Sequence, residues 1–291
     1  MLDISVVIPS YNQPATIRQC LASVLAQDFT GSYEVIIVDS SSTEYRSAIA
    51  EVAAADERVR LIQLAQQTFP GPARNVGIKA AQSERIALID SDCVAHVSWL
   101  SSIVKQMESG IILTGVIENG TPQSVYGTCS FLVEFNHFLA PKQPRQAIHA
   151  AATCNFACHK TVFEEVGYFT DDRAFEDMLF CNKYKSIGGT VYQFRNIKIK
   201  HVNKTELAPI IRNQKMLGFY SAKVRRANGL PPQLVFRLPL LTFGLLAFRY
   251  VSIFSRGVRS KYFGRFLWYT PVVLWLLLHW SIGFYRGAQE T

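Results

Sequence analysis

Paired cysteines and a secretory leader are both missing from this 291-residue sequence. The six cysteines form no Cys-x-x-Cys pair and lie among apolar residues, so we expect reduced core thiols rather than disulfides. The N-terminus enters an apolar run at Ile4 without a charged segment and a leader-type apolar stretch before it. These features exclude a disulfide-stabilised secreted domain and predict that the N-terminal part stays in the cytosol.

Acidic residues are scarce in the last third of the chain. From Lys204 to Thr291, 13 Lys and Arg residues occur with only two acids, so this tail carries +11 while the first 203 residues carry −3. The basic residues are interspersed with apolar ones, which fits an anionic lipid surface better than a nucleic acid. We therefore expect a membrane surface as a partner and no nucleic acid.

The first part of the chain alternates between apolar strands and helical stretches. Apolar runs at 3–8 and 34–39 flank a helical stretch at 14–27, and the alternation continues to a strand at 85–89. This pattern predicts an α/β fold with a mostly parallel sheet, whose functional residues lie at the C-terminal ends of the strands.

The strand at 85–89 runs directly into two carboxylates, Asp90 and Asp92, separated by Ser91. Acids at the end of a strand can turn toward a ligand, and Mg²⁺ or Mn²⁺ prefers oxygen ligands of this kind. A nucleoside diphosphate offers further oxygens, so the triplet is able to bridge a divalent metal, a ribose and a diphosphate. Acids that simply cap the following turn are the alternative interpretation.

Three other segments accompany this triplet. Residues 8–12 (Ile-Pro-Ser-Tyr-Asn) follow the first strand, residues 38–42 (Val-Asp-Ser-Ser-Ser) end the second, and residues 71–77 (Gly-Pro-Ala-Arg-Asn-Val-Gly) open a helix. In this order they resemble the nucleotide-binding half of family 2 glycosyltransferases. Later segments resemble the acceptor half of that family: 155–160, 166–169, 175–177 and 200–201.

The resemblance covers residues 3–203 and implies the type A glycosyltransferase fold (GT-A), a single α/β domain. Within it, residues 1–110 would bind the nucleotide sugar and residues 111–203 would bind the acceptor. Residues 204–291 would form an appended basic, hydrophobic tail that associates with a membrane.

The resemblance also implies a nucleobase site. Tyr11 would stack on the base, Asp39 would hydrogen-bond its edge, Arg74 would lie near the base or the diphosphate, and Pro9 would line the same site. A uracil base, and hence a UDP-sugar, is the expected donor, although many relatives carry two acids where this chain has Asp39 and Ser40. The alternatives are turn packing for Tyr11, turn formation for Asp39 and a surface ion pair for Arg74.

The diphosphate and metal would be bound beside this site. By the same resemblance, Asp90 would face the ribose, with Ser91 beside it in the donor site. Asp92 would hold Mg²⁺ or Mn²⁺, with His201 as an additional ligand. A hydrogen-bonded histidine at the end of a strand remains the alternative interpretation of His201.

Two acids, Glu176 and Asp177, stand at the start of a predicted helix. Acids are favoured there by free backbone N–H groups, so helix capping is one interpretation. As a catalytic residue, Asp177 would act as the general base that deprotonates an acceptor hydroxyl, and Glu176 is the second candidate. Direct displacement of this kind inverts the anomeric configuration.

The tail contains two apolar stretches. Residues 266–284 lack Lys, Arg, Asp and Glu and are long enough to span a bilayer, although a buried core helix is an alternative. Residues 234–254 are interrupted by Arg237 and Arg249, which favours an interfacial or re-entrant segment. A basic helix near 206–228 would lie on the membrane surface or present a solvated face.

Together these observations predict a glycosyltransferase at the cytoplasmic face of a membrane. Its acceptor would be a membrane-associated or lipid-linked saccharide used for cell-surface polysaccharide or glycolipid. A nucleotidyltransferase also uses paired acids and Mg²⁺, but no glycine-rich triphosphate loop is evident in the sequence. A non-catalytic nucleotide-sugar-binding scaffold is a third possibility, and retention of Asp90, Asp92 and Asp177 counts against it.

Overall fold

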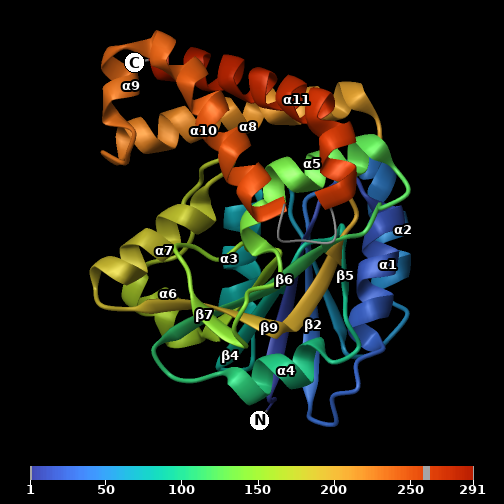
Figure 1. The fold of residues 1–291 in the computed structure, drawn as a ribbon. Helices are drawn as coiled ribbons and strands as arrows, with labels where there is room; N and C mark the ends of the chain where they lie inside the picture. The colour runs from blue at the N-terminus through green and yellow to red at the C-terminus, as the bar shows by residue number, and fades with distance from the viewer. Residues whose placement is uncertain (1, 258–262, 291) are drawn as a thin grey trace. The chain divides into compact units, whose positions relative to one another are not determined.

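A computed structural model describes residues 2–257 and 263–290 (Figure 1). The chain divides into two compact units, each built from separate stretches of sequence. The first combines Met1–Glu118 with Ala140–Val202, and the second combines Asn119–Leu139 with Asn203–Thr291. Residues 119–139, which the sequence analysis groups with the acceptor half, thus pack with the tail.

The first unit contains a mixed sheet with helices. Its strands are β1 (Ile4–Ser10), β2 (Tyr33–Asp39), β3 (Val59–Gln63), β4 (Arg85–Ile89), β5 (Cys93–Ala95), β6 (Ile111–Asn119), β7 (Arg145–Ala147), β8 (Asn155–His159) and β9 (Thr190–His201). Its helices are α1 (Pro14–Leu25), α2 (Thr43–Ala53), α3 (Pro70–Ala80), α4 (Trp99–Gln106), α6 (Lys160–Val166) and α7 (Glu176–Ser186). The predicted α/β fold is confirmed.

The order of the strands places the ends of β1, β2 and β4 side by side. Among the described residues the sheet runs β3-β2-β1-β4-β8-β6-β9-β5, with β7 paired to β9. The neighbours from β3 to β4 are parallel, and β4 pairs antiparallel with β8. Because β1, β2 and β4 are fully or almost fully buried, their sequences are mainly apolar. Inside β1 and β2 the buried Ser5 hydroxyl donates to Glu34 at 2.7 Å, and other polar residues follow where the strands end.

An aromatic cluster fixes the segment that leads into α7. Phe169 and Phe180 have ring centroids 4.9 Å apart, and Phe163 lies 5.0 Å from Phe180. All three are buried in the same core as Val7 and Leu88 of the parallel strands. Buried aromatic pairs stabilise the fold by more than their buried area alone would give. This cluster therefore holds the start of α7 against the sheet.

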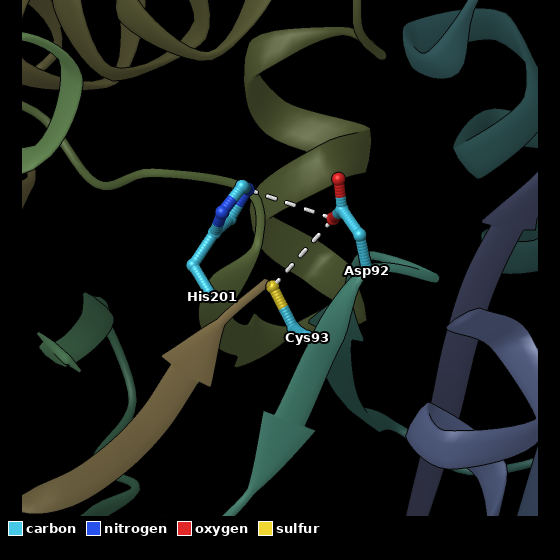
Figure 2. Close-up of side chains that lie close together, drawn as sticks. All are labelled: Asp92, Cys93 and His201. Carbon is cyan, nitrogen blue, oxygen red and sulfur yellow. Dashed lines mark hydrogen bonds and ion pairs between the residues drawn. The ribbon is translucent and has the colours of Figure 1, made fainter. Parts of the chain in front are cut away.

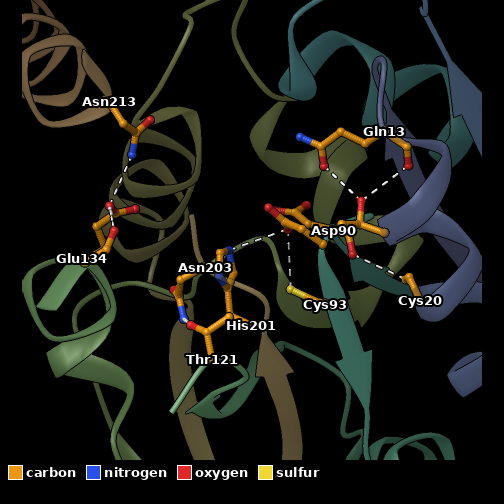
Figure 3. A network of polar contacts seen from close by, with 12 residues as sticks. Gln13, Cys20, Asp90, Cys93, Thr121, Glu134, His201, Asn203 and Asn213 are labelled. Atoms are coloured by element: carbon orange, nitrogen blue, oxygen red, sulfur yellow. Dashed lines mark hydrogen bonds and ion pairs between the residues drawn. The ribbon is translucent and has the colours of Figure 1, made fainter. Parts of the chain in front are cut away.

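The second unit is helical. Its elements are α5 (Val125–Phe135), η1 (Asn136–Phe138), α8 (Leu207–Ala227), α9 (Gln233–Arg237), η2 (Pro239–Leu241), α10 (Thr242–Gly257) and α11 (Phe263–Gln289). Part-buried polar contacts join α5 to α8. Glu134 accepts a hydrogen bond from Asn213 at 3.2 Å (Figure 3) and another from Gln214 at 2.7 Å. Residues 119–139 are thereby part of the helical unit.

Glycines allow α8 and α11 to approach each other closely. A Cβ at Gly218 would meet the carbonyl of Trp280, and a Cβ at Gly283 would meet the carbonyl of Lys215. A third contact joins Gly287 to the carbonyl of Phe219. At these three points the backbones of the two helices are in direct contact.

One helical segment in the described part of the chain, Leu267–Gln289, is long and apolar enough to cross a membrane. In its most apolar window, 44% of the residues are buried inside the fold. The expectation for the cysteines is confirmed: all six are free and buried.

Candidate active site

The Asp90-Ser91-Asp92 triplet forms the turn between β4 and β5. The backbone N–H of Cys93 donates to the carbonyl of Asp90 at 3.0 Å, and the thiol of Cys20 on α1 donates to the same carbonyl at 3.3 Å (Figure 3). Ser91 is buried, whereas the side chains of Asp90 and Asp92 remain 28% and 27% exposed. Both carboxylates are therefore accessible to a ligand, as the sequence pattern predicts.

Asp92 and His201 come together although 109 positions of sequence separate them. The antiparallel pairing of β5 with β9 sets Cys93 opposite His201. His201 Nε2 then lies 3.6 Å from Asp92 Oδ1. Figure 2 shows the side chains of Asp92, Cys93 and His201 converging from the facing ends of these strands. One potential ligand atom of each residue lies within 4.8 Å of those of the other two.

These donors fit a divalent cation. A carboxylate oxygen and an imidazole nitrogen are both ligands for such ions, and partial exposure leaves room for oxygens from another molecule. Cys93 differs, because burial raises the pKa of its thiol well above the usual value. A neutral thiol is a poor ligand for Mg²⁺ or Mn²⁺, so Asp92 and His201 are the better candidates.

Arg74 joins the Asp90 turn to the start of α7. Its Nη2 donates to Asp90 Oδ1 at 2.6 Å and its Nη1 donates to Glu176 Oε1 at 2.8 Å, and the residue is only 2% exposed. Burial alone would lower the pKa of Arg74, but the charges of Asp90 and Glu176 outweigh burial and raise it. The guanidinium is thus a permanent cation between two acids that lie far apart in the sequence.

The rest of α3 packs against the same region. The side-chain amide of Asn75 donates to the Phe169 carbonyl at 2.8 Å and accepts from its N–H at 3.1 Å. A Cβ at Gly71 would lie 2.8 Å from the carbonyl of Thr170 and 3.1 Å from Glu176 Cγ, so only glycine fits there without a shift. The 71–77 segment therefore fixes residues 169–176 through a glycine, an arginine and an asparagine.

The two acids at the start of α7 differ in their surroundings. Glu176 is buried, and burial followed by repulsion from Asp177 raises its pKa to about 7 against the opposing effect of Arg74. Asp177 is half-buried and accepts the Met178 N–H at 2.7 Å. Burial also raises the pKa of Asp177. Glu176 is engaged with Arg74, so Asp177 is the acid better able to meet a substrate.

Pro9, Tyr11 and Asp39 lie at the adjacent ends of β1 and β2. Pro9 is buried opposite Val38, whereas the Tyr11 side chain is exposed. Asp39 is 1% exposed; its Oδ1 accepts the Ser41 hydroxyl at 2.6 Å, and its Oδ2 has no hydrogen-bond partner among the residues described. A buried carboxylate oxygen without a partner can accept a hydrogen bond from a bound ligand.

Backbone strain marks both regions. In the described ranges, the non-glycine residues with positive φ are Asn12 at 53° and Phe175 at 69°. Asn12 directly follows Tyr11, and Phe175 directly precedes Glu176. Such conformations cost free energy and tend to occur at functional sites, and here they adjoin residues proposed independently from the sequence.

Sequence reasoning missed three features of this region. Cys93 was predicted only as a core thiol, the contacts of Arg74 with Asp90 and Glu176 were not predicted, and Asn75 was assigned no role. The 71–77 segment was the available signal, because an arginine and an asparagine at the start of a buried helix require polar partners.

Comparison with known proteins identifies the family. Residues 5–167 match the model of Glycosyl transferase family 2. Glycosyltransferase AglE of Haloferax volcanii is 30% identical over 57% of this chain and 55% of its own length. Poly(ribitol-phosphate) beta-N-acetylglucosaminyltransferase TarS of Staphylococcus aureus is 31% identical over 43% of this chain and 23% of its own length. The alignments thus span about half or less of these relatives.

Two solved structures share the fold across nearly the whole chain. The mannosyltransferase PcManGT from Pyrobaculum calidifontis, in complex with GDP-Man and Mn²⁺, superposes with a TM-score of 0.67 at 16% identity and covers 99% of this chain and 88% of that one. S. aureus TarS 1–349 with UDP-GlcNAc gives a TM-score of 0.56 at 16% identity, over 98% and 90%. Since the family model matches more than half of a chain with this GT-A architecture, the chain belongs to glycosyl transferase family 2.

Proposed function

We propose that this chain transfers a sugar from a nucleoside-diphosphate sugar to a hydroxyl group of a saccharide acceptor, with inversion at the anomeric carbon. The observation that carries the proposal is the Arg74 bridge, which holds Asp90 of the donor-side turn 2.6 Å from one end of a guanidinium and Glu176 2.8 Å from the other. The bridge sets the predicted base, Asp177, next to the acids predicted to bind the donor.

Asp177 would act as the general base. Its carboxylate accepts the proton of the acceptor hydroxyl, whose oxygen bonds to the anomeric carbon while the bond from that carbon to the diphosphate breaks. The electron pair leaves with the diphosphate, and attack from the opposite face inverts the configuration. The raised pKa of Asp177 suits this role, because a stronger base accepts a proton more readily.

Asp92 and His201 would hold a divalent cation beside the diphosphate. When bound, such an ion supplies positive charge that offsets the negative charge of the leaving group. A carboxylate and an imidazole 3.6 Å apart support this assignment, and PcManGT is described with Mn²⁺. Asp90 would orient the ribose, with Ser91 supporting the turn.

The donor would be a UDP-sugar. Asp39 Oδ2 is a buried acceptor that the ring N–H of uracil would satisfy, and exposed Tyr11 would cover the face of the base above Pro9. TarS is described with UDP-GlcNAc. The GDP-Man in PcManGT makes a GDP-sugar the natural competitor in a binding experiment.

The acceptor would be a membrane-associated or lipid-linked saccharide, and the enzyme would work at the cytoplasmic face of a membrane. The tail supports this proposal, because residues 204–291 carry +11 and contain an apolar helix of sufficient length for a bilayer. We therefore assign residues 1–203 to catalysis, with 1–110 for the donor and 111–203 for the acceptor, and residues 204–291 to membrane association.

A thermal-shift panel tests the donor proposal. The detergent-solubilised chain is heated with UDP, GDP, dTDP, CDP or ATP, each with and without Mn²⁺, because a ligand that binds the folded state raises the melting temperature. We expect stabilisation by UDP that requires Mn²⁺ and is lost in Asp92→Asn. Stabilisation by ATP alone would indicate a nucleotidyltransferase, and no response to any nucleotide would contradict the proposal.

A further inference from the structure

Large apolar side chains are exposed mainly in one stretch of the helical unit. Of 16 exposed large hydrophobic residues in the described chain, ten lie between residues 234 and 275. Leu240, Phe248 and Trp268 are 75%, 73% and 85% exposed. We call these ten exposed residues between 234 and 275 the apolar patch. They lie on or between α9, η2, α10 and α11, of which α10 contacts both η2 and α11. Large exposed apolar surface marks a contact with another molecule or a membrane.

On α10 and α11 the patch follows the helical repeat. Phe248 and Val251 are exposed one turn apart on α10, and Leu267 and Trp275 are exposed two turns apart on α11. The opposite side of α11 is buried, as at Leu276. Each helix therefore has an inner face that packs in the fold and an outer apolar face that is exposed among the described residues.

The stretch of sequence that carries the patch has charges of one sign. Residues 207–289 contain 12 Lys and Arg residues and no Asp or Glu. A protein partner would have to supply both an apolar surface and a large negative charge, whereas a bilayer with anionic headgroups has both by composition. The sequence and the exposed surface thus favour a lipid surface as the occupant.

The packing of α11 opposes a membrane-spanning orientation. The contacts of Gly218, Gly283 and Gly287 hold the C-terminal half of α11 against α8. Within the same unit, the Arg226 guanidinium on α8 donates to the Ala288 carbonyl at 2.9 Å. If α11 crossed the bilayer, α8 would follow it with Lys215, Lys223 and Arg226, and cations are costly in hydrocarbon.

We infer that α9, η2, α10 and α11 lie in the plane of an anionic membrane, with the apolar patch inserted among the lipids and both ends of α11 on the same side. The inference rests on the proposed membrane association and specifies how it occurs. Basic residues at the edges of these helices contact the headgroups, and α8 stays outside the hydrocarbon. The chain is attached to one leaflet and does not span the bilayer.

Association and orientation are measured separately on the full chain. Flotation with phosphatidylcholine vesicles, with and without phosphatidylglycerol, measures association. For orientation, Gly264→Cys and Gln289→Cys place a thiol near each end of α11, at residues that are exposed. The chain is added outside preformed vesicles and treated with a membrane-impermeant maleimide. The native cysteines are all buried and give a low background.

We expect flotation that depends on phosphatidylglycerol and weakens with salt, with both thiols labelled from outside. Replacing Phe248 and Trp268 by Ser should reduce vesicle binding at least about tenfold. Val97→Ser with Ile187→Ser is the matched control, because these side chains are 52% and 58% exposed on the other unit; it should float like the wild type.

Two results would overturn the inference in different ways. Flotation with the Gln289→Cys thiol protected would show that α11 spans the membrane, and the proposed membrane association would survive. A chain that stays with the buffer and elutes as a dimer would assign the patch to a contact between copies. In that case the membrane association itself would be wrong.

Discussion

Arg74 offers the sharpest test of the active site. Arg74→Gln keeps a polar side chain of moderate size but removes the cation between Asp90 and Glu176. Both contacts are short, at 2.6 and 2.8 Å, and the arginine is almost completely buried. Removal therefore leaves a buried carboxylate at Glu176 without its counter-ion, which must either remain charged or take up a proton.

The magnitude follows from burial. Breaking a buried ion pair by removing one partner costs about 3–5 kcal/mol. In a chain of this size about 1 kcal/mol corresponds to roughly 2–4 °C in melting temperature, so we expect a fall on the order of 10 °C. The proposed base, Asp177, should also move, because α3 holds residues 169–176. A displacement of about 1 Å costs roughly a hundredfold in rate.

The matched control is Arg145→Gln. Arg145 pairs with Glu108 at 2.8 Å, the same distance as between Arg74 and Glu176. In this pair, however, the side chains of Arg145 and Glu108 are 35% and 56% exposed. Such a pair contributes about 1 kcal/mol or less. Arg145→Gln should therefore unfold within about 4 °C of the wild type and retain its turnover.

A double variant separates the ion pair from general damage to α3. Arg74→Gln with Glu176→Gln removes both charges, so it should recover part of the stability lost in Arg74→Gln alone, while turnover stays low. Melting is followed by circular dichroism and turnover by release of the nucleoside diphosphate. If Arg74→Gln alone had the stability and kcat of the wild type, the assigned role of Arg74 would be refuted.

The remaining predictions concern the metal, the base and the donor. Asp92→Asn should abolish the Mn²⁺-dependent part of nucleotide stabilisation while Cys93→Ser retains it, and loss in both variants would contradict the ligand assignment. Burial raises the pKa of Asp177. A general base must be ionised to accept a proton, so kcat should begin to fall on acidification at a pH above about 3.9, the usual aspartate pKa. The Asp177→Asn variant should bind the donor but show no turnover. An acid limb at the ordinary value would argue against this residue. Asp39→Asn should weaken UDP binding at least about tenfold in a calorimetric titration, because the amide no longer offers two acceptor oxygens, and unchanged binding would remove Asp39 from the donor site.

The parallel part of the fold was predictable because its signals are local. β1, β2 and β4 are buried on both faces, so each is a mainly apolar run followed by polar residues, as at Asp90. β5 and β8 were not predicted, because β5 has only three residues and β8 has only three apolar residues between Asn155 and His159. Their existence depends on pairing with β9 and β4, which are distant in sequence.

The proximity of some site residues was predictable, but most of their contacts were not. The family resemblance placed Asp92 and His201 in one site, and their side chains lie 3.6 Å apart. The β5–β9 register that sets Cys93 opposite His201 depends on strand pairing. Arg74 was expected near a ligand, and its carboxylate partners lie 16 and 102 positions away. Contacts over such separations follow from topology, which residue spacing does not specify.

The way the chain is divided between the two units affects how a shorter version of the protein should be designed. Residues 119–139 leave the catalytic unit after β6 and the chain returns at Ala140. Ending the chain at residue 203 would keep α5 but delete the Asn213 and Gln214 amides that bond to Glu134, and would uncover the apolar side of α5. A soluble catalytic fragment therefore requires a second edit, in which a short loop replaces 119–139 as well.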